Sequence, residues 1–304
     1  MANKYIRDYR LSYSAGDTDI LVQVDPDYIA NATFAMFPTE DEANDAFGTT
    51  DLPLKINYVF KDCTGLVAAP RLPESAVCSG TLSTQGLFYN CPLLKIAPML
   101  PRDYVGTPKS LISAFYGCSA LLEAPVIPIG VINASYMFRN ASKLKYPVSI
   151  PASVTNMSYL FRDAADATGE MIVRGTPSSY TSAFYGTTKP ITLYGDQSVC
   201  NTLAGTANNG NVTWADWYDP VPAVMNRGQG SYTTAADMTR MVRNGALAVA
   251  TYAPGRMRYQ TGDIVREDEW FALVEAAQTI DPDVTFSTRY DNLNRIEAAF
   301  DSAL

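Results

Sequence analysis

The sequence has no histidine among its 304 residues. This absence excludes Ser-His-Asp and Cys-His catalysis, HExxH zinc sites and histidine-based pH switches. The motifs GxxxxGK[ST], GxGxxG and GxSxG are also missing, so the sequence contains no known phosphate-binding loop and no nucleophile elbow. Chemistry based on carboxylates or thiolates remains open at this point.

Positive charge is scarce. The chain carries 23 Lys and Arg residues against 31 Asp and Glu residues, which gives a net charge of -8 and a pI near 4.6. This balance argues against non-specific binding to nucleic acid or to anionic lipid, because both need a basic surface. Hydrophobic residues make up 47% of the chain, enough for a buried core, and the length favours two domains.

Long apolar runs are also lacking. No window approaches 18 apolar residues, so we expect no membrane insertion. The N-terminus has no apolar stretch of the kind that a Sec signal peptide requires, and we expect synthesis in a cytoplasm. The five cysteines are odd in number and form no CxxC pair, which favours free, buried thiols. They are Cys63, Cys78, Cys91, Cys118 and Cys200.

What the sequence does contain is an internal repeat. Six phenylalanines recur at intervals of 28, 27, 23, 23 and 23 residues: Phe60, Phe88, Phe115, Phe138, Phe161 and Phe184. Six residues after the first four of them come Leu66, Leu94, Leu121 and Leu144. Three residues after the six come Cys63, Cys91 and Cys118, and then Ala141, Ala164 and Thr187. A unit this short cannot bury its own apolar face, so we expect the repeats to stack, with Phe over Phe, Leu over Leu and small residues in the third column.

The clearest units read LFYNCPLLKIAPMLP, AFYGCSALLEAPVIP and MFRNASKLKYPVSIP. Over roughly residues 56–203 this pattern resembles the BspA-type leucine-rich repeats of bacterial surface proteins and of phages that infect gut Bacteroidetes. The resemblance implies a short solenoid of about six units, each of 23–28 residues. It is specific for the fold and weak for function, because members of the family bind different partners. The units around Ala167 and Pro190 lack the Leu and the Cys, which predicts a C-terminal cap.

We therefore expect an α+β fold in three parts. They are an N-terminal cap or anchor segment (1–55), a leucine-rich-repeat solenoid (56–218) and a C-terminal helical interaction domain (219–304).

Local patterns predict several elements outside the repeats. In the N-terminal segment we expect a strand over Asp19–Val24 and a helix that Thr39 caps. Residues 201–211 are predicted to form a loop. In the C-terminal domain we expect helices from Thr233 or Thr234 to Asn244 with Gly245 as the stop, over Ile264–Ile280, and from Thr288 or Asp291 to Ala303.

The cysteines and the clustered acidic residues could serve catalysis or metal binding, but a purely structural role also explains their positions. Cysteines at one repeat position favour a buried column over a metal site, since metal ligands would not follow the repeat. The runs at residues 40–42 and 267–269 are acidic enough to suggest calcium or a glycosidase. Both lie at predicted helix N-termini, where the helix dipole favours acids, and no DxDxDG loop accompanies them. We expect no catalytic residue, no cofactor and no metal.

Two groups of residues are candidates for a binding surface. Tyrosines near the repeat Phe would form rows on a stack, where Tyr is a favoured contact residue: Tyr89, Tyr116, Tyr136, Tyr159 and Tyr185. Trp214, Asp216 and Trp217 resemble a carbohydrate site, in which aromatic rings stack on sugars and a carboxylate accepts hydroxyl groups. The tyrosine rows could equally cover the flank of the stack, and the tryptophans could be core.

Together these patterns predict a non-enzymatic structural protein of a phage virion, associated with a tail, collar or fibre. Its expected partners are other virion proteins, further copies of itself in a symmetric assembly, and a glycan or protein of the host surface. A bacterial cell-surface adhesin with the same repeats is one alternative. A carbohydrate-active enzyme that uses carboxylates is another.

Overall fold

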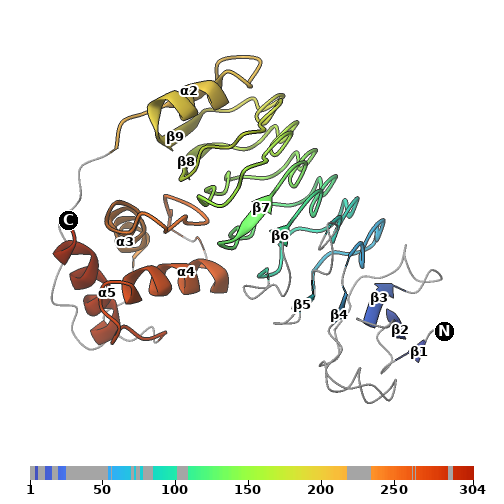
Figure 1. The fold of residues 1–304 in the computed structure, drawn as a ribbon, viewed down its shortest axis with the longest axis horizontal. Helices are drawn as coiled ribbons and strands as arrows, with labels where there is room; N and C mark the ends of the chain where they lie inside the picture. The colour runs from blue at the N-terminus through green and yellow to red at the C-terminus, as the bar shows by residue number, and fades with distance from the viewer. Residues whose placement is uncertain are drawn as a thin grey trace.

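The computed structural model describes most of the repeat region and of the C-terminal part, together with short strands near the N-terminus. The described residues are 4–5, 11–15, 20–24, 54–55, 57–69, 72, 76–77, 85–100, 109–217, 234–261, 263, 265–286 and 290–304. Cys78 and the predicted helix after Thr39 lie outside them. The fold is mixed α/β, with small sheets along the repeats and four helices among the described residues (Figure 1). None of the described helices is long and apolar enough to span a membrane.

The described strands form three sheets. A sheet of order β1-β2-β3-β4-β5 contains Lys4–Tyr5, Leu11–Ala15, Ile20–Val24, Leu54–Lys55 and Ala76–Val77. The strand β3 confirms the predicted strand at Asp19–Val24. Further along, β6 (Lys109–Ser110) pairs in parallel with β7 (Val131–Asn133). A parallel sheet of order β10-β9-β8 then contains Val212–Trp214, Ile191–Gly195 and Gly169–Val173.

The six repeat phenylalanines form one continuous column of rings. Neighbouring ring centroids lie 5.1 to 5.7 Å apart, with the ring planes 3° to 20° from parallel. Each of the six side chains has a relative exposure of 0%. Offset stacking at this spacing adds to the free energy gained by burying the rings.

The residues around each repeat Phe, from two positions before it to two positions after it, form the Phe segment. Backbone N–H groups of a Phe segment donate to carbonyl oxygens of the following repeat. Around Phe138 three alternate N–H groups donate to the following repeat at 2.9 to 3.0 Å: Tyr136 to Ser158, Phe138 to Leu160 and Asn140 to Arg162. On another side of the stack, single parallel bridges connect Ala68, Ile96, Glu123 and Tyr146 in turn. Both sides therefore hold successive repeats together through the main chain.

Each Phe segment needs two left-handed residues. The residue two positions after each Phe has a φ of 57° to 79° and is always Asp, Asn or Gly, the types that adopt this conformation most readily. The residue two positions before has a φ of 51° to 60°, and there the types are Tyr, Gly and Ser. The first position is thus a sequence signal for the turn, whereas Tyr at the second position goes against backbone preference.

The stack ends in a cap after Phe184. The helix α2 (Gln197–Ala204) starts at Asp196, whose carboxylate accepts the N–H of Val199, and it buries Cys200 and Leu203. The prediction of a loop from residue 201 was therefore wrong at its start. The polar composition of residues 201–211 favours a loop. The helix forms nevertheless, because the apolar residues Cys200 and Leu203 are buried in the core of the repeats.

The C-terminal part contains α3 (Ala235–Ala248), α4 (Glu267–Gln278) and α5 (Tyr290–Ser302). These helices confirm the three predicted ones, including Thr234 as the N-cap of α3. The expected stop at Gly245 was wrong, because α3 continues through it. A Cβ at Gly245 would lie 2.8 Å from Cζ of Phe300, so this glycine allows α5 to approach α3.

The helices pack against one side of the stack (Figure 1). Ile172 of β8 and Tyr194 of β9 belong to the same buried cluster as the helices. Arg174, directly after β8, donates to the carbonyl oxygens of Ala246, Val249 and Tyr252. A cation at the C-terminus of α3 complements the helix dipole, so a residue of the repeats completes this helix.

Candidate binding face

The six tyrosines near the repeat phenylalanines lie in two adjacent columns. Aligning the repeats on Phe places Tyr89, Tyr116 and Tyr185 one residue after it, and Tyr58, Tyr136 and Tyr159 two residues before it. Tyr58 and Tyr185 are 36% and 42% exposed, and the other four are half-buried.

Cations fill the remaining positions of the first column. They are Lys61, Arg139 and Arg162, and the sequence analysis did not single them out although the same alignment contains them. We refer to these three residues and the six tyrosines as the tyrosine–arginine face. The Arg139 guanidinium lies 5.5 to 5.8 Å from the ring centroids of Tyr116, Tyr136 and Tyr159. At this distance the electron-rich rings hold a cation in place.

The tyrosine rings stack on one another. The centroids of Tyr89 and Tyr116 are 4.7 Å apart with planes 5° from parallel, and those of Tyr136 and Tyr159 are 4.6 Å apart. One face of each of these four rings is therefore covered by its neighbour, and the Arg139 guanidinium lies beside three of them. This leaves ring edges, phenolic hydroxyls and guanidinium N–H groups for a ligand, which favours hydrogen bonds and charge over stacking.

The three cations differ in their carboxylate partners. Lys61 lies 4.0 Å from Asp62, and Arg162 lies 3.4 Å from Asp163. Within the described residues, Arg139 forms no ion pair, and its Nε atom is buried without a hydrogen-bond partner. The face therefore has a local excess of positive charge on a chain whose net charge is -8.

Trp214 and Trp217 do not belong to this face. The ring of Trp217 stacks on Tyr194 with centroids 5.9 Å apart and lies 5.3 Å from the guanidinium of Arg174. Trp214 donates from Nε1 to the carbonyl of Gly195 at 3.2 Å. Asp216 is exposed beside them. The two rings are thus engaged in packing where the chain leaves the repeats.

The structure buries the repeat cysteines completely. Sγ of Cys91 donates to the carbonyl of Phe60 at 2.9 Å, and burial raises the pKa of the Cys63 and Cys118 thiols to about 12. The thiols of Cys91 and Cys118 donate to backbone carbonyls, and thiols whose pKa is raised by burial stay protonated at neutral pH, unlike metal ligands or nucleophiles. Across the residues that the structure describes, no three Cys, Asp or Glu side chains gather as metal ligands.

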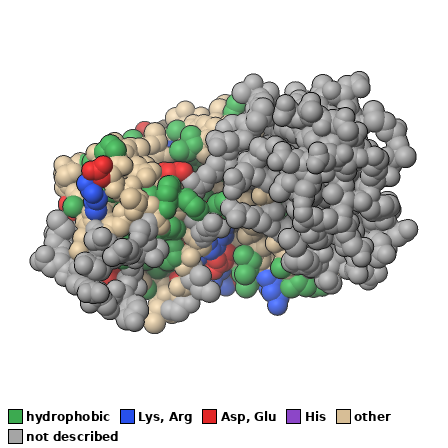
Figure 2. All heavy atoms as spheres, turned by 90° about the horizontal axis from the view of Figure 1, so that it is seen from below, with side chains coloured by type: hydrophobic (Ala, Val, Ile, Leu, Met, Phe, Trp, Pro, Cys, Tyr) green, Lys and Arg blue, Asp and Glu red, His purple; other side chains and the backbone are tan. Residues whose placement is uncertain are grey.

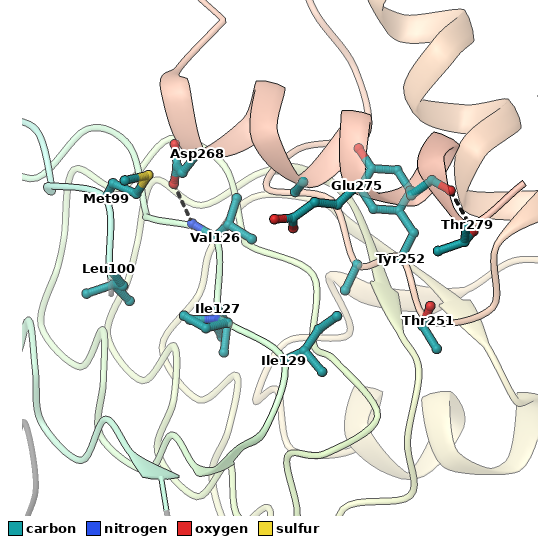
Figure 3. Close-up of a pocket in the computed structure, with 14 residues that line it drawn as sticks. Met99, Leu100, Val126, Ile127, Ile129, Thr251, Tyr252, Asp268, Glu275 and Thr279 are labelled. Carbon is teal, nitrogen blue, oxygen red and sulfur yellow. Dashed lines mark hydrogen bonds between the residues drawn. The ribbon is translucent and has the colours of Figure 1, made fainter. Parts of the chain in front are cut away.

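A pocket of about 390 Å³ lies between the repeats and α4 (Figure 3). Its walls are mainly apolar, with Leu100, Ile127 and Ile129 on one side and Ala272 and Ala276 on the other. The lower face of the molecule shows hydrophobic side chains gathered beside acidic and basic ones (Figure 2). The described walls suit a small apolar group.

Asp268 of this pocket and the neighbouring Glu269 make contacts that stabilise the fold. Asp268 accepts the N–H of Val126 at 2.8 Å, the bond drawn as a dashed line in Figure 3. It also pairs with Arg266 at 2.5 Å. Glu275 extends from the same helix, two turns later (Figure 3). Glu269 pairs with Arg256 at 2.7 Å. The described part of the acidic run at 267–269 thus lies at the N-terminus of α4, as predicted, and also binds the repeats to the helices.

No protein-family model matches the chain, and comparisons with curated proteins and with solved structures find no match.

Proposed function

We propose that this chain is a non-enzymatic structural and binding protein of a phage virion, built on a BspA-type leucine-rich-repeat solenoid. In this role the stacked repeats form a rigid extended support, and the tyrosine–arginine face contacts a host surface. The terminal segments contact other virion proteins or further copies of the chain. Repetition of the face around a symmetric particle converts weak single contacts into strong attachment.

The proposal rests on the division of the repeated residues between the core and the surface of the stack. The Phe, Leu and Cys columns are fully buried, and the backbone of each repeat bonds to the next. Among the side chains that the repeats expose at matching positions are tyrosines and cations. A rigid stack that displays one side-chain pattern several times supports binding by an extended surface.

The carboxylates give less support to an enzyme. Hydrolysis of a glycosidic bond uses two carboxyl groups on opposite sides of the bond. Asp268 and Glu275 line the same pocket, but they lie on one helix at positions two turns apart, and Asp268 is already bound to Arg266 and Val126. This arrangement places both acids on one wall.

Fractionation of the source culture tests the proposal. An antibody against the recombinant chain is used to probe purified particles, cell envelopes and cleared supernatant. We expect the chain in the particle fraction, at a fixed ratio to the other particle proteins after repeated density-gradient purification. Immunogold labelling then locates it on the particle.

The two alternatives predict other results. Recovery of the chain in washed cell envelopes, with none in particles, would replace the proposal by a cell-surface adhesin. Release of reducing sugars from a panel of polysaccharides by the purified chain, lost in Asp268→Asn and Glu275→Gln variants, would replace it by an enzyme.

A further inference from the structure

We propose that the tyrosine–arginine face binds an anionic polysaccharide through the guanidinium groups of Arg139 and Arg162. The inference rests on the proposed function and assigns a ligand class to its binding face. The recognised groups are carboxylates or sulfates carried on successive sugars.

The first argument is charge. Arg139 and Arg162 occupy the same position in consecutive repeats, so their guanidinium groups are neighbours along the column. Both lie beside the ring of Tyr159, at 5.8 and 5.5 Å from its centroid. One carboxylate, that of Asp163, pairs with Arg162 in the described structure, and its side chain is 41% exposed. Two adjacent cations that share a single carboxylate partner, bound to Arg162, attract a further anion.

The second argument is preorganisation. Arg139 is held by three rings, and Arg162 by Tyr159 and by Tyr185, whose centroid is 5.0 Å from the guanidinium. Side chains that are fixed before binding lose little entropy when the ligand arrives. Guanidinium groups also fit carboxylates and sulfates with paired hydrogen bonds.

The third argument is backbone strain. Tyr58, Tyr136 and Tyr159 have φ values of 53°, 59° and 60°, a region in which a bulky residue costs about 1–2 kcal/mol relative to right-handed backbone. Other repeats place Gly or Ser at this position. Strain that a fold tolerates at a few positions is typical of functional surfaces. The left-handed conformation of these tyrosines lowers the stability of the fold, but it places their rings next to the cations.

The geometry favours a polysaccharide over other anions. Nucleic acid would need a basic protein surface and ring faces free for base stacking, but the net charge is -8 and the described rings pair with each other. An extended peptide would need a free strand edge or an apolar groove. Here the N–H groups around Phe138 and Phe161 already donate to the next repeat. A tyrosine hydroxyl occurs once in each repeat and a guanidinium group in two consecutive repeats, an arrangement that matches a chain of polar sugars.

Binding of the full chain to polygalacturonate, dextran sulfate and neutral dextran tests the proposal, measured by biolayer interferometry at 50 and 150 mM salt. We expect binding to one or both anionic polymers, weaker at the higher salt, and none to neutral dextran. Arg139→Gln and Arg162→Gln should each weaken binding about tenfold, since each removes a charged hydrogen-bonding group. Arg139→Lys should fall between Arg139→Gln and the unchanged chain.

Lys189→Gln is the matched control. It removes one positive charge from the same stack, but Lys189 pairs with Asp166 at 2.7 Å and, among the described contacts, makes no ion pair or ring contact with the residues of the face. We expect its affinity to stay within about twofold of the unchanged chain. Circular dichroism and thermal unfolding of all variants verify that they are folded.

The arms of the experiment separate the outcomes. Binding to polygalacturonate alone identifies carboxylates as the recognised group, and binding to dextran sulfate alone identifies sulfates. Tighter binding to poly-glutamate than to either polysaccharide overturns the proposal in favour of an acidic peptide. Equal losses in Lys189→Gln and the arginine variants, or no binding to any anionic polymer, also overturn it. A chain found in particles that binds none of these polymers contradicts this inference and leaves the virion role intact.

Discussion

The thiol of Cys118 donates a hydrogen bond to the carbonyl oxygen of Phe88, 3.1 Å away in the preceding repeat. Cys91 makes the same bond to Phe60. The two bonds run beside the column of stacked rings, so backbone, thiol and ring contacts coincide at one edge of the stack. Each of these two repeats is therefore joined to the preceding one by a thiol as well as by its ring.

Replacing Phe138 with Ala should destabilise the chain by about 3–5 kcal/mol, because the ring is fully buried between two others. Phe138→Leu, which keeps most of the volume, should cost less. Urea unfolding followed by circular dichroism measures both. Ile129→Ala is the control, since Ile129 is 67% exposed and should change stability by less than about 0.5 kcal/mol. Equal losses of stability in Phe138→Ala and Ile129→Ala would contradict a stabilising role of the buried ring column.

Stability should fall as the pH rises from about 9 to about 12. Burial raises the pKa of Cys63 and Cys118 from 9.0 to about 12, so in this interval the unfolded chain loses thiol protons that the folded chain keeps. Denaturant midpoints at pH 7, 9 and 10.5 measure the trend.

A Cys63→Ala, Cys91→Ala, Cys118→Ala triple variant is the control for this pH dependence. Alanine occupies the same position in the repeats that contain Ala141 and Ala164, so the substitution suits the fold. The variant should show a shallower decline of stability with pH. An unchanged slope would mean that groups other than the thiols cause it.

The cap after the last Phe should protect two specific amide protons. The N–H groups of Phe184 and Gly186 donate to Oγ1 of Thr206 at 3.1 Å and to Oδ1 of Asn208 at 3.2 Å. Thr206→Val and Asn208→Ala should each cost about 1 kcal/mol and speed hydrogen exchange at their partner amide. Thr202→Val serves as the control, because that hydroxyl bonds only within α2, to Ser198. Unchanged exchange at Phe184 and Gly186 would show that these side chains are dispensable.

Arg256→Met should destabilise the contact between helices and repeats by about 3–5 kcal/mol. The substitution leaves the buried Glu269 without its ion-pair partner, although it still accepts the N–H of Arg266, and it removes the pair with Glu123 of the repeats at 3.2 Å. An Arg256→Met, Glu269→Leu double variant should recover much of the loss.

Arg295→Met is the control for this ion pair. Arg295 also pairs with two carboxylates, but its side chain is 45% exposed, so its loss should change the thermal midpoint little. Similar midpoints for Arg256→Met and Arg295→Met would refute the importance of the buried pair.

The periodic part of this protein follows from its residue pattern alone. A Phe, a small residue three positions later and a Leu six positions later require a stack of neighbours, because one unit is too short to cover them. The Asp, Asn or Gly two residues after each Phe even marks the left-handed turn. Periodicity and capping were also sufficient for the three C-terminal helices, since Thr234 and the acidic run at 267–269 act over a single turn.

The way in which the helices meet the repeats depends on contacts between residues far apart in the chain. Gly245 was read as a helix stop because local propensity cannot register the ring of Phe300, 55 positions away in the chain. Arg174 as a cap for α3, and Arg139 surrounded by three tyrosine rings, likewise depend on residues that are distant in sequence. Local rules act through bonded neighbours and hydrogen bonds within a turn. Contacts across the stack depend on which columns of residues the fold brings together. The distance in space between two such residues does not follow from their local sequence patterns.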